Sequence, residues 1–435
     1  MIWLIPKCLS SLDLLAFFLS RGLLNTKSVL VCFHQDIYCF QFMSRIRINA
    51  PASRRQFLGT GLPLCLGAAV FASQHGFSEP RRLKAAVIGH TGRGDYGHGL
   101  ESIFQNLPGV ELIAVADPDA KGRTQTAAKI GAPNVYADYR EMLERHKPHL
   151  VSVAMRHADQ HHAIALAAVR SGAHVYCEKP FTTTPQEGDE VLKEAGLRRL
   201  KIAVAHTMRM TAPVLSLKAA IARGILGDLV ELHAYGKQDA RAGGEDMMVL
   251  GTHLFDLMRL FAGDPISCSA EVLNQGRRIA RSDARLVKDT VGWVAGDQIS
   301  AHYLFKHGVN ASFTSAGKLR DTVGRWGLEL HGSRGLARIN CDLEPHVFLC
   351  KKGDWSKEGR GDAWTPLEIA TLQPSTTHNE KPVNDWLAAI ETNHEPECSA
   401  QNGLWAVEMV MAVYQSALTG ARIDFPIKER RHPLG

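Results

Sequence analysis

The feature that most constrains the fold is an apolar strand that runs directly into a glycine-rich loop. Residues 83–88 are apolar apart from one lysine, and residues 96–105 can form a helix after the loop. A second apolar run, 110–116, ends at Asp117. Glycines let backbone N–H groups approach a pyrophosphate, a helix N-terminus favours its charge, and the acid suits ribose hydroxyls. The pattern predicts a dinucleotide-binding α/β domain.

The glycine-rich loop departs from the usual motif at one position. Thr91 stands where the second glycine of Gly-x-Gly-x-x-Gly would lie. An acid at Asp117 repels a 2′-phosphate, so NAD is the expected cofactor, whereas Lys121 and Arg123 keep NADP as the alternative. The residues expected to contact the cofactor in this region are Gly89, Thr91, Gly92, Arg93, Gly94 and Asp117.

The alternation of strands and helices continues to a short buried strand that ends in a charged motif. Residues 174–177 are followed by Glu178-Lys179-Pro180. Proline biases the preceding residue towards extended geometry, and ligands of open α/β sheets bind beyond the carboxyl ends of the strands. The sequence therefore fixes the cation of Lys179 at the edge where a cofactor and a substrate would meet.

The N-terminal segment has the pattern of an export signal. Arg54 and Arg55 precede a Gly/Ala-rich apolar run over residues 62–72. Twin arginines before a short apolar run are typical of the twin-arginine signal, and the run is too short to span a bilayer. We expect a periplasmic protein with no stable membrane anchor after processing. We also expect translation to begin at Met43, with an extra membrane anchor in residues 1–42 as the alternative.

Composition argues against several other classes of protein. The formal net charge is +6, but the basic residues are scattered and do not interleave with aromatic residues, so no nucleic-acid surface is predicted. The chain has nine cysteines and no Cys-x-x-Cys spacing, so neither a disulfide framework nor a zinc site is predicted. Three histidines (His157, His161 and His162) precede or begin a helix, and polar contacts at the helix start explain them without a metal.

Taken in order, the motifs after residue 80 resemble the Gfo/Idh/MocA family, which includes glucose–fructose oxidoreductase and inositol dehydrogenase. The matching motifs are the glycine-rich loop, Ala116-Asp117, His161, Glu178-Lys179-Pro180 and Gly251-Thr252-His253-Leu254-Phe255-Asp256. The resemblance implies a doubly wound parallel Rossmann sheet, then an α+β domain with a large, open, mostly antiparallel sheet. It also implies NAD(P), a sugar or polyol substrate, and sheets paired between subunits in a homodimer or homotetramer.

This reading divides the chain into three parts. Residues 1–80 form the extension with the signal, 81–205 the Rossmann domain, and 206–435 the substrate-binding and oligomerisation domain. In the last part we expect a helix over 247–261, and closing helices over 383–392 and 404–418. The strands expected between them are 267–273, 290–294, 298–305, 310–314, 327–330 and 335–339.

The resemblance also assigns roles to individual residues. Lys179 supplies a fixed cation that stabilises a developing oxyanion, and His253 acts as general base because its ordinary pKa lies near neutrality. Asp256, one helical turn further on, is expected to orient the imidazole, with an ordinary role in helix packing as the alternative. His161 and Glu178 join the cofactor-binding set.

Two positions depart from the family pattern and keep the reaction open. Val249 replaces an aspartate found in many members, and Glu245 or Asp246 would have to compensate. Arg156-His157 replaces the usual Thr-Pro. The leading hypothesis is a NAD(P)-dependent oxidoreductase that moves a hydride between cofactor and a hydroxyl substrate. The alternatives are a redox-neutral glycoside hydrolase or lyase with tightly held NAD, and a non-catalytic sugar-binding protein.

Overall fold

The computed structural model describes residues 31–33, 36–38, 82–319, 326–342, 345–351, 364–368 and 378–435. The chain divides into one unit up to His75 and a second from Gly76 to the end. In the first unit, β1 (Val31–Phe33) pairs antiparallel with β2 (Asp36–Tyr38). The predicted export signal at Arg54 and Arg55 lies outside the described residues. Among the described helices, none has the length and hydropathy of a membrane span.

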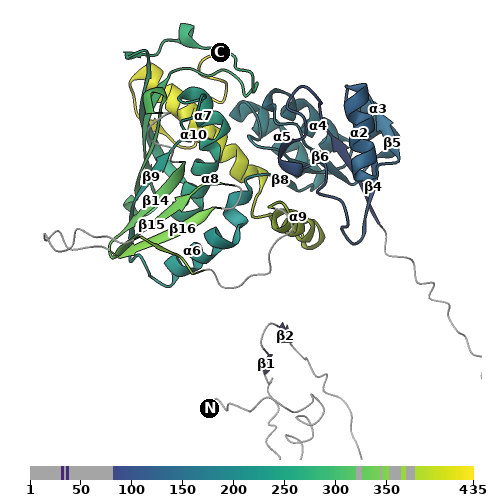
Figure 1. The fold of residues 1–435 in the computed structure, drawn as a ribbon, viewed down its shortest axis with the longest axis horizontal. Helices are drawn as coiled ribbons and strands as arrows, with labels where there is room; N and C mark the ends of the chain where they lie inside the picture. Colours follow the sequence, from purple (N-terminus) through teal and green to yellow (C-terminus); the bar gives the residue numbers. More distant parts are fainter. Residues whose placement is uncertain are drawn as a thin grey trace, which may run out of the picture. The chain divides into compact units, whose positions relative to one another are not determined.

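The second unit begins with the predicted Rossmann sheet. Six parallel strands lie in the order β5–β4–β3–β6–β7–β8, with helices on both faces (Figure 1). The strands are β3 (Leu83–Ile88), β4 (Val110–Ala116), β5 (Asn134–Tyr136), β6 (Leu150–Val153), β7 (His174–Cys177) and β8 (Ile202–Val204). The helices are α2 (Ala120–Ile130), α3 (Tyr139–His146), α4 (His161–Arg170) and α5 (Pro185–Arg198). The order confirms a doubly wound parallel fold.

The helix predicted over residues 96–105 is absent, and this prediction was wrong. A single 3-10 turn, Gly97–Gly99, is followed by further turns. His98 and Gly99 have φ of 49° and 78°, so the backbone leaves the helical region there.

A helix from the far end of the sequence packs beside these turns. In α9 (Glu380–Thr392), Trp386 is fully buried and packs against Phe104 and Tyr176, with ring centroids 6.4 Å and 5.7 Å away. The C-terminal part of the chain therefore completes the core of the N-terminal domain.

A larger sheet forms the rest of the second unit. In the described residues it has ten strands, in the order β11–β10–β12–β13–β9–β14–β15–β16–β17 with β18 beside β10. Only β13 and β9 pair in parallel among these strands. The strands are β9 (Leu229–Tyr235), β10 (Pro265–Asn274), β11 (Arg277–Arg278), β12 (Gln298–Phe305), β13 (Asn310–Ala316), β14 (Gly327–Gly332), β15 (Gly335–Asn340), β16 (His346–Lys351), β17 (Thr365–Pro366) and β18 (Ile423–Asp424). The large, mostly antiparallel sheet is thus confirmed.

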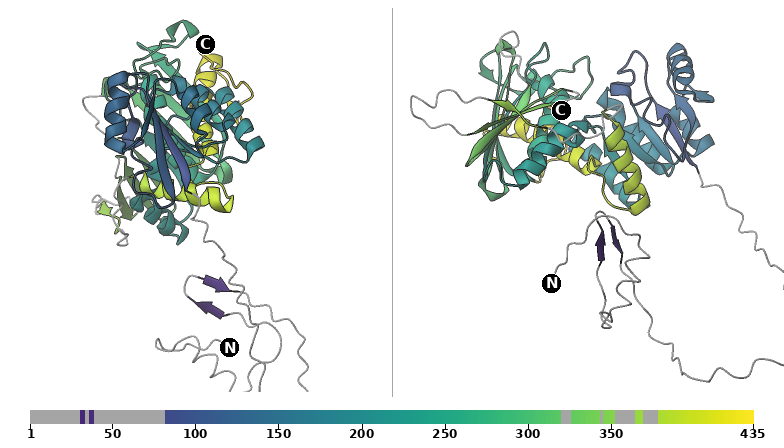
Figure 2. Two further views of the ribbon diagram at one scale, coloured as in Figure 1. Left: turned by 90° about the vertical axis from the view of Figure 1, so that its right-hand side faces the viewer. Right: turned by 60° about the horizontal axis from the view of Figure 1, so that its bottom comes forward.

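Helices cover one face of this sheet (Figures 1 and 2). The covering helices include α7 (Gly244–Val249), α8 (Gly251–Ala262) and α10 (Ala400–Thr419), whereas α6 (Ala212–Ala222) packs near β16. Phe255 of α8 packs on Phe313 of the sheet, with ring centroids 5.0 Å apart. The helix predicted over 247–261 is broken at Leu250. The strand predicted over 290–294 is absent, because Thr290 and Gly292 have φ of 43° and 87°.

Candidate active site

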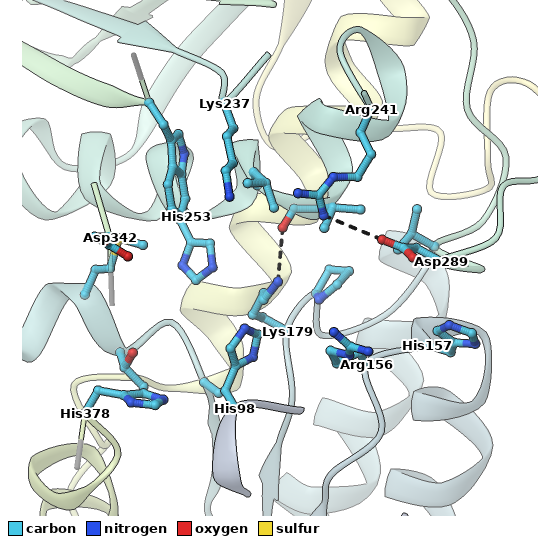
Figure 3. Close-up of a pocket in the computed structure, with 18 of the residues that line it drawn as sticks. His98, Arg156, His157, Lys179, Lys237, Arg241, His253, Asp289, Asp342 and His378 are labelled. Atoms are coloured by element: carbon cyan, nitrogen blue, oxygen red, sulfur yellow. Dashed lines mark hydrogen bonds and ion pairs between the residues drawn. The ribbon is translucent and has the colours of Figure 1, made fainter. Parts of the chain in front are cut away.

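A cavity of about 330 Å³ opens where the carboxyl ends of the parallel strands face α7 and α8 (Figure 3). Lys179 and His98 point into it from the Rossmann domain, and His253 and Lys237 point into it from the second domain. The other polar lining residues are Arg156, His157, Thr207, Arg241, Asp289, Trp326, Asp342, His378 and Asn379. Cationic side chains and imidazoles therefore dominate the wall.

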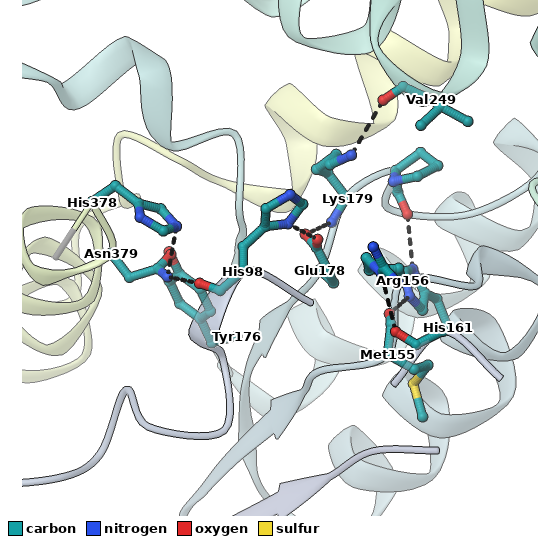
Figure 4. Close-up of polar contacts among 12 residues, drawn as sticks. His98, Met155, Arg156, His161, Tyr176, Glu178, Lys179, Val249, His378 and Asn379 are labelled. Atoms are coloured by element: carbon teal, nitrogen blue, oxygen red, sulfur yellow. Dashed lines mark hydrogen bonds and ion pairs between the residues drawn. The ribbon is translucent and has the colours of Figure 1, made fainter. Parts of the chain in front are cut away.

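Lys179 occupies the position predicted for it, at the end of β7. Its residue is only 6% exposed, and its Nζ donates a hydrogen bond to the Val249 carbonyl over 3.2 Å (Figure 4). The Lys179–Pro180 peptide bond is cis. Burial lowers the pKa of Lys179, and Glu178 opposes that shift. The ammonium is thus held by one carbonyl at the boundary between the two domains.

Glu178 lies beneath this lysine and is fully buried. Its Oε2 accepts from the Lys179 backbone N–H over 2.6 Å, and its Oε1 pairs with His98 Nδ1. Burial raises the pKa of Glu178, but His98 and Lys179 outweigh burial and lower this pKa to about 2. Glu178 therefore stays ionised and fixes the backbone that carries Lys179.

His161, which was expected to bind the cofactor, is buried, and its ring lies between two backbone carbonyls. Its Nδ1 lies 2.8 Å from the Pro180 carbonyl and its Nε2 lies 2.7 Å from the Met155 carbonyl (Figure 4). It lines neither this cavity nor a second one beside the glycine-rich loop. His161 joins the ends of β6 and β7, so its contact with the site is indirect.

His253 lies on α8 and faces the cavity, 8% exposed. Burial, followed by the charge of Lys179, lowers the pKa of His253 well below its ordinary value of 6.5. A neutral imidazole can accept a proton at neutral pH. Its ring lies 5.4 Å from that of His206 and 5.7 Å from that of Trp326, and its Nδ1 has no hydrogen-bond partner among the described residues.

The carboxylates expected to support His253 are engaged elsewhere. Asp256 is 1% exposed and accepts from Arg209 Nη1 over 2.5 Å, so it does not orient the imidazole. A full positive charge holds the carboxylate more strongly than a neutral ring would. Asp246 accepts from Lys237 N, Gln238 N and Ser315 Oγ, so it does not replace the aspartate missing at Val249.

A second cavity, of about 360 Å³, lies beside the glycine-rich loop. Met155 lines this cavity, and the next residue, Arg156, lines the first one, so the two flank the end of β6. Gly89 lines the second cavity, where a Cβ would come within 2.1 Å of the Tyr96 ring, and a Cβ on Gly94 would come within 2.7 Å of a backbone nitrogen. This crowding explains the glycines, and the paired cavities fit the two halves of a dinucleotide.

Asp117 lies at the wall of this second cavity but is fully buried. Its Oδ2 accepts from Thr91 N, Thr91 Oγ1 and Tyr96 OH over 3.0, 2.7 and 3.0 Å. Its Oδ1 accepts from Asp119 N over 2.9 Å. Thr91 in place of glycine therefore ties the loop to Asp117, and contact of Asp117 with a ribose stays a prediction.

The remaining residues of the glycine-rich loop make contacts that hold the conformation of the loop. Gly92, with φ of 79°, donates its N–H to Asp95 over 2.8 Å, and Arg93 pairs with Asp159 in the 3-10 turn Ala158–Gln160 between β6 and α4. The loop is therefore held in place without a following helix.

Sequence reasoning missed several residues of the first cavity, notably His98, Lys237, Arg241 and Trp326. Lys237 lies two residues after the end of the half-buried strand β9, and a cation at a strand end was a readable signal. His98 reaches the cavity from the turn Gly97–Gly99 and Trp326 from the residue before β14, and the sequence pattern reveals neither position.

Comparison with known proteins assigns the family. Residues 83–206 match the model described as the oxidoreductase family, NAD-binding Rossmann fold, and residues 218–425 match its C-terminal alpha/beta domain. The chain belongs to the Gfo/Idh/MocA oxidoreductase family. Its Rossmann domain is therefore NAD-binding.

The following relatives have low sequence identity, but the similarity extends over most of the length of each relative. D-apiose dehydrogenase of Paraburkholderia graminis is 22% identical over 81% of this chain and 92% of its own. The structure of an NAD binding oxidoreductase from Klebsiella pneumoniae has a TM-score of 0.63 at 21% identity, over 80% of this chain and all of its own. Aldose-aldose oxidoreductase from Caulobacter crescentus, complexed with glycerol, has a TM-score of 0.63 at 19% identity, over 79% and 100%. These structures share the fold.

Proposed function

We propose that this oxidoreductase oxidises a secondary hydroxyl of a sugar or polyol and passes the hydride to NAD. The observation that carries the proposal is the meeting of Lys179 and His253 in one cavity, from two different domains. The relatives named D-apiose dehydrogenase and D-glucoside 3-dehydrogenase support a sugar substrate.

Each side chain has a task that its position allows. NAD, when bound, supplies the carbon that accepts the hydride. The neutral imidazole of His253 takes the hydroxyl proton, and the cation of Lys179 stabilises the negative charge that develops on the oxygen. The carbonyl of Val249 holds that cation, and the carboxylate of Glu178 holds the backbone N–H of the same residue.

A sugar panel with the purified chain tests the function against both alternatives. Net formation of NADH with one oxidised sugar is the expected result. Sugar cleavage without net NADH would favour the redox-neutral lyase or hydrolase. Ligand-induced stabilisation with no product would favour a binding protein. Mass spectrometry of the denatured protein identifies any nucleotide that co-purifies with it.

We also propose export by the twin-arginine route, which transports folded proteins with their cofactor. Arg54, Arg55 and the apolar run 62–72 support it. Replacing both arginines with lysine is expected to retain the protein in the cytoplasm on cell fractionation. Normal export of that variant would contradict the signal, and a native N-terminus upstream of Met43 would contradict the expected start.

We propose a homo-oligomer that pairs the uncovered faces of the large sheets. His233, Ser312 and Glu329 lie side by side on adjacent strands of that face and are half-buried in a single copy. Ser312→Arg is expected to lower the mass measured by light scattering, whereas exposed Thr124→Arg on α2 leaves it unchanged. A monomeric native protein would contradict the pairing.

A further inference from the structure

The first cavity holds two lysine ammonium groups that form no ion pair with a carboxylate of the described residues. The ammonium of Lys179 donates to the Val249 carbonyl, and Lys237 Nζ lies 5.8 Å from the centre of the Trp326 ring. Figure 3 shows both side chains pointing into the same space from opposite domains. Two like charges that share a cavity repel each other, and an anion between them removes that repulsion.

The arginines that line the same cavity already have hydrogen-bond or ion-pair partners, unlike Lys237. Arg241 makes a two-pronged contact with Asp239, at 3.0 and 2.5 Å, and lies 3.7 Å from Asp289. Arg156 donates to the Gly94 carbonyl over 3.2 Å, on the side of the glycine-rich loop. Lys237 therefore brings into the cavity, from the second domain, a charge that forms no ion pair within the described residues.

Lys237 is also held in place by a built support. Asp246, fully buried, accepts from the backbone N–H groups of Lys237 and Gln238 over 3.2 and 3.0 Å. A Cβ on Gly236 would come within 2.2 Å of that carboxylate, so the turn needs glycine there. The acid that fails to support His253 thus fixes the start of the Lys237 side chain.

The Trp326 ring connects Lys237 with the reacting end of the cavity. Its centre lies 5.8 Å from Lys237 Nζ and 5.7 Å from the His253 ring. Aromatic rings pack against the C–H faces of sugars, and an ammonium binds a carboxylate by a charge-assisted hydrogen bond.

We infer that Lys237 forms a carboxylate subsite and that the substrate is a sugar acid, such as a hexuronate, oxidised at a hydroxyl distant from its carboxylate. This inference rests on the proposed function. The C–H hydride goes to NAD, the O–H proton goes to His253, and the C–O bond becomes a carbonyl. The carboxylate is unchanged and serves only to bind.

Calorimetry on the NADH-saturated protein tests the subsite with matched probes. D-Glucuronate and D-galacturonate are compared with D-glucose and D-galactose. We expect the acids to bind at least about tenfold more tightly, as for one charge-assisted contact. Lys237→Met is expected to remove that difference without weakening the binding of the neutral sugars, Lys237→Arg retains most of it, and exposed Lys218→Met on α6 changes nothing.

Several outcomes would overturn the inference. They are equal affinities for acids and neutral sugars, including no binding of either, tighter binding of D-glucose 6-phosphate than of the hexuronates, and a Lys237→Met variant that loses NADH affinity instead. Hydride transfer is followed separately as NADH absorbance. Acid-selective binding with no hydride transfer to any sugar would refute the proposed function and leave the subsite in place.

Discussion

Lys179 is the residue whose charge serves the reaction more than the fold. Lys179→Met keeps the approximate length of the side chain and removes its charge. We expect turnover to fall by at least about a hundredfold, the scale for one oriented electrostatic group, with little change in melting temperature. Steady-state kinetics and thermal unfolding check this, with exposed Lys193→Met on α5 as control. Full activity of the Lys179→Met protein would remove the catalytic role.

His206, beside His253, makes stability depend on pH. Burial lowers the pKa of His206 from 6.5 to about 4. Between these values the unfolded chain binds a proton at this residue and the folded chain does not, so the free energy of unfolding falls as the pH drops from about 6.5 towards 4. His206→Gln is expected to make that fall shallower in urea titrations at successive pH values. An unchanged slope would show that His206 does not contribute.

At the scale of elements, α8 is joined to the turn after β8 by the buried pair of Arg209 and Asp256. Their side chains are 7% and 2% exposed. Asp256→Asn leaves the guanidinium buried without a counter-charge, which typically costs about 3–5 kcal/mol. Replacing both residues, Arg209→Met with Asp256→Leu, is expected to recover much of this loss. Urea unfolding of the single and double variants measures it, and a double variant less stable than Asp256→Asn would contradict the argument.

The elements also show what sequence reasoning could and could not establish. Sequence reasoning could predict the parallel strands, Lys179 at the end of β7 and His253 on α8. Apolar runs and strand ends can be recognised from the local sequence. The missing helix at 96–105 was not, because His98 there takes a positive φ to reach Glu178. The pairing of Asp256 with Arg209 and the position of Lys237 in the cavity depend on packing between distant segments, which no local pattern specifies.

At the scale of the whole second unit, α10 contributes side chains to the cores of both domains, and α9 packs into the core of the Rossmann domain. Trp386 is fully buried and donates its indole N–H to the Lys201 carbonyl over 3.2 Å. Trp386→Ala is expected to cost about 3–5 kcal/mol. Hydrogen exchange in urea should show peptides from β3 and β4 losing protection before those from β14 and β15 in this variant. In the unchanged protein we expect both regions to open together, and earlier loss of protection in β3 there would contradict cooperative unfolding of the two domains.

The dependence of the Rossmann domain on α9 and α10 has a consequence for the order of events during synthesis. Trp386 and Leu404 fill its core from positions near the end of the chain. Ribosomes make proteins from the N-terminus, so β3 and β4, which flank the nucleotide site, leave the ribosome about 260 residues or more before α9 and α10. The nucleotide domain is thus translated before the large sheet but lacks part of its core until α9 and α10 have been made. We expect this domain to hold its cofactor stably only once α9 and α10 have left the ribosome.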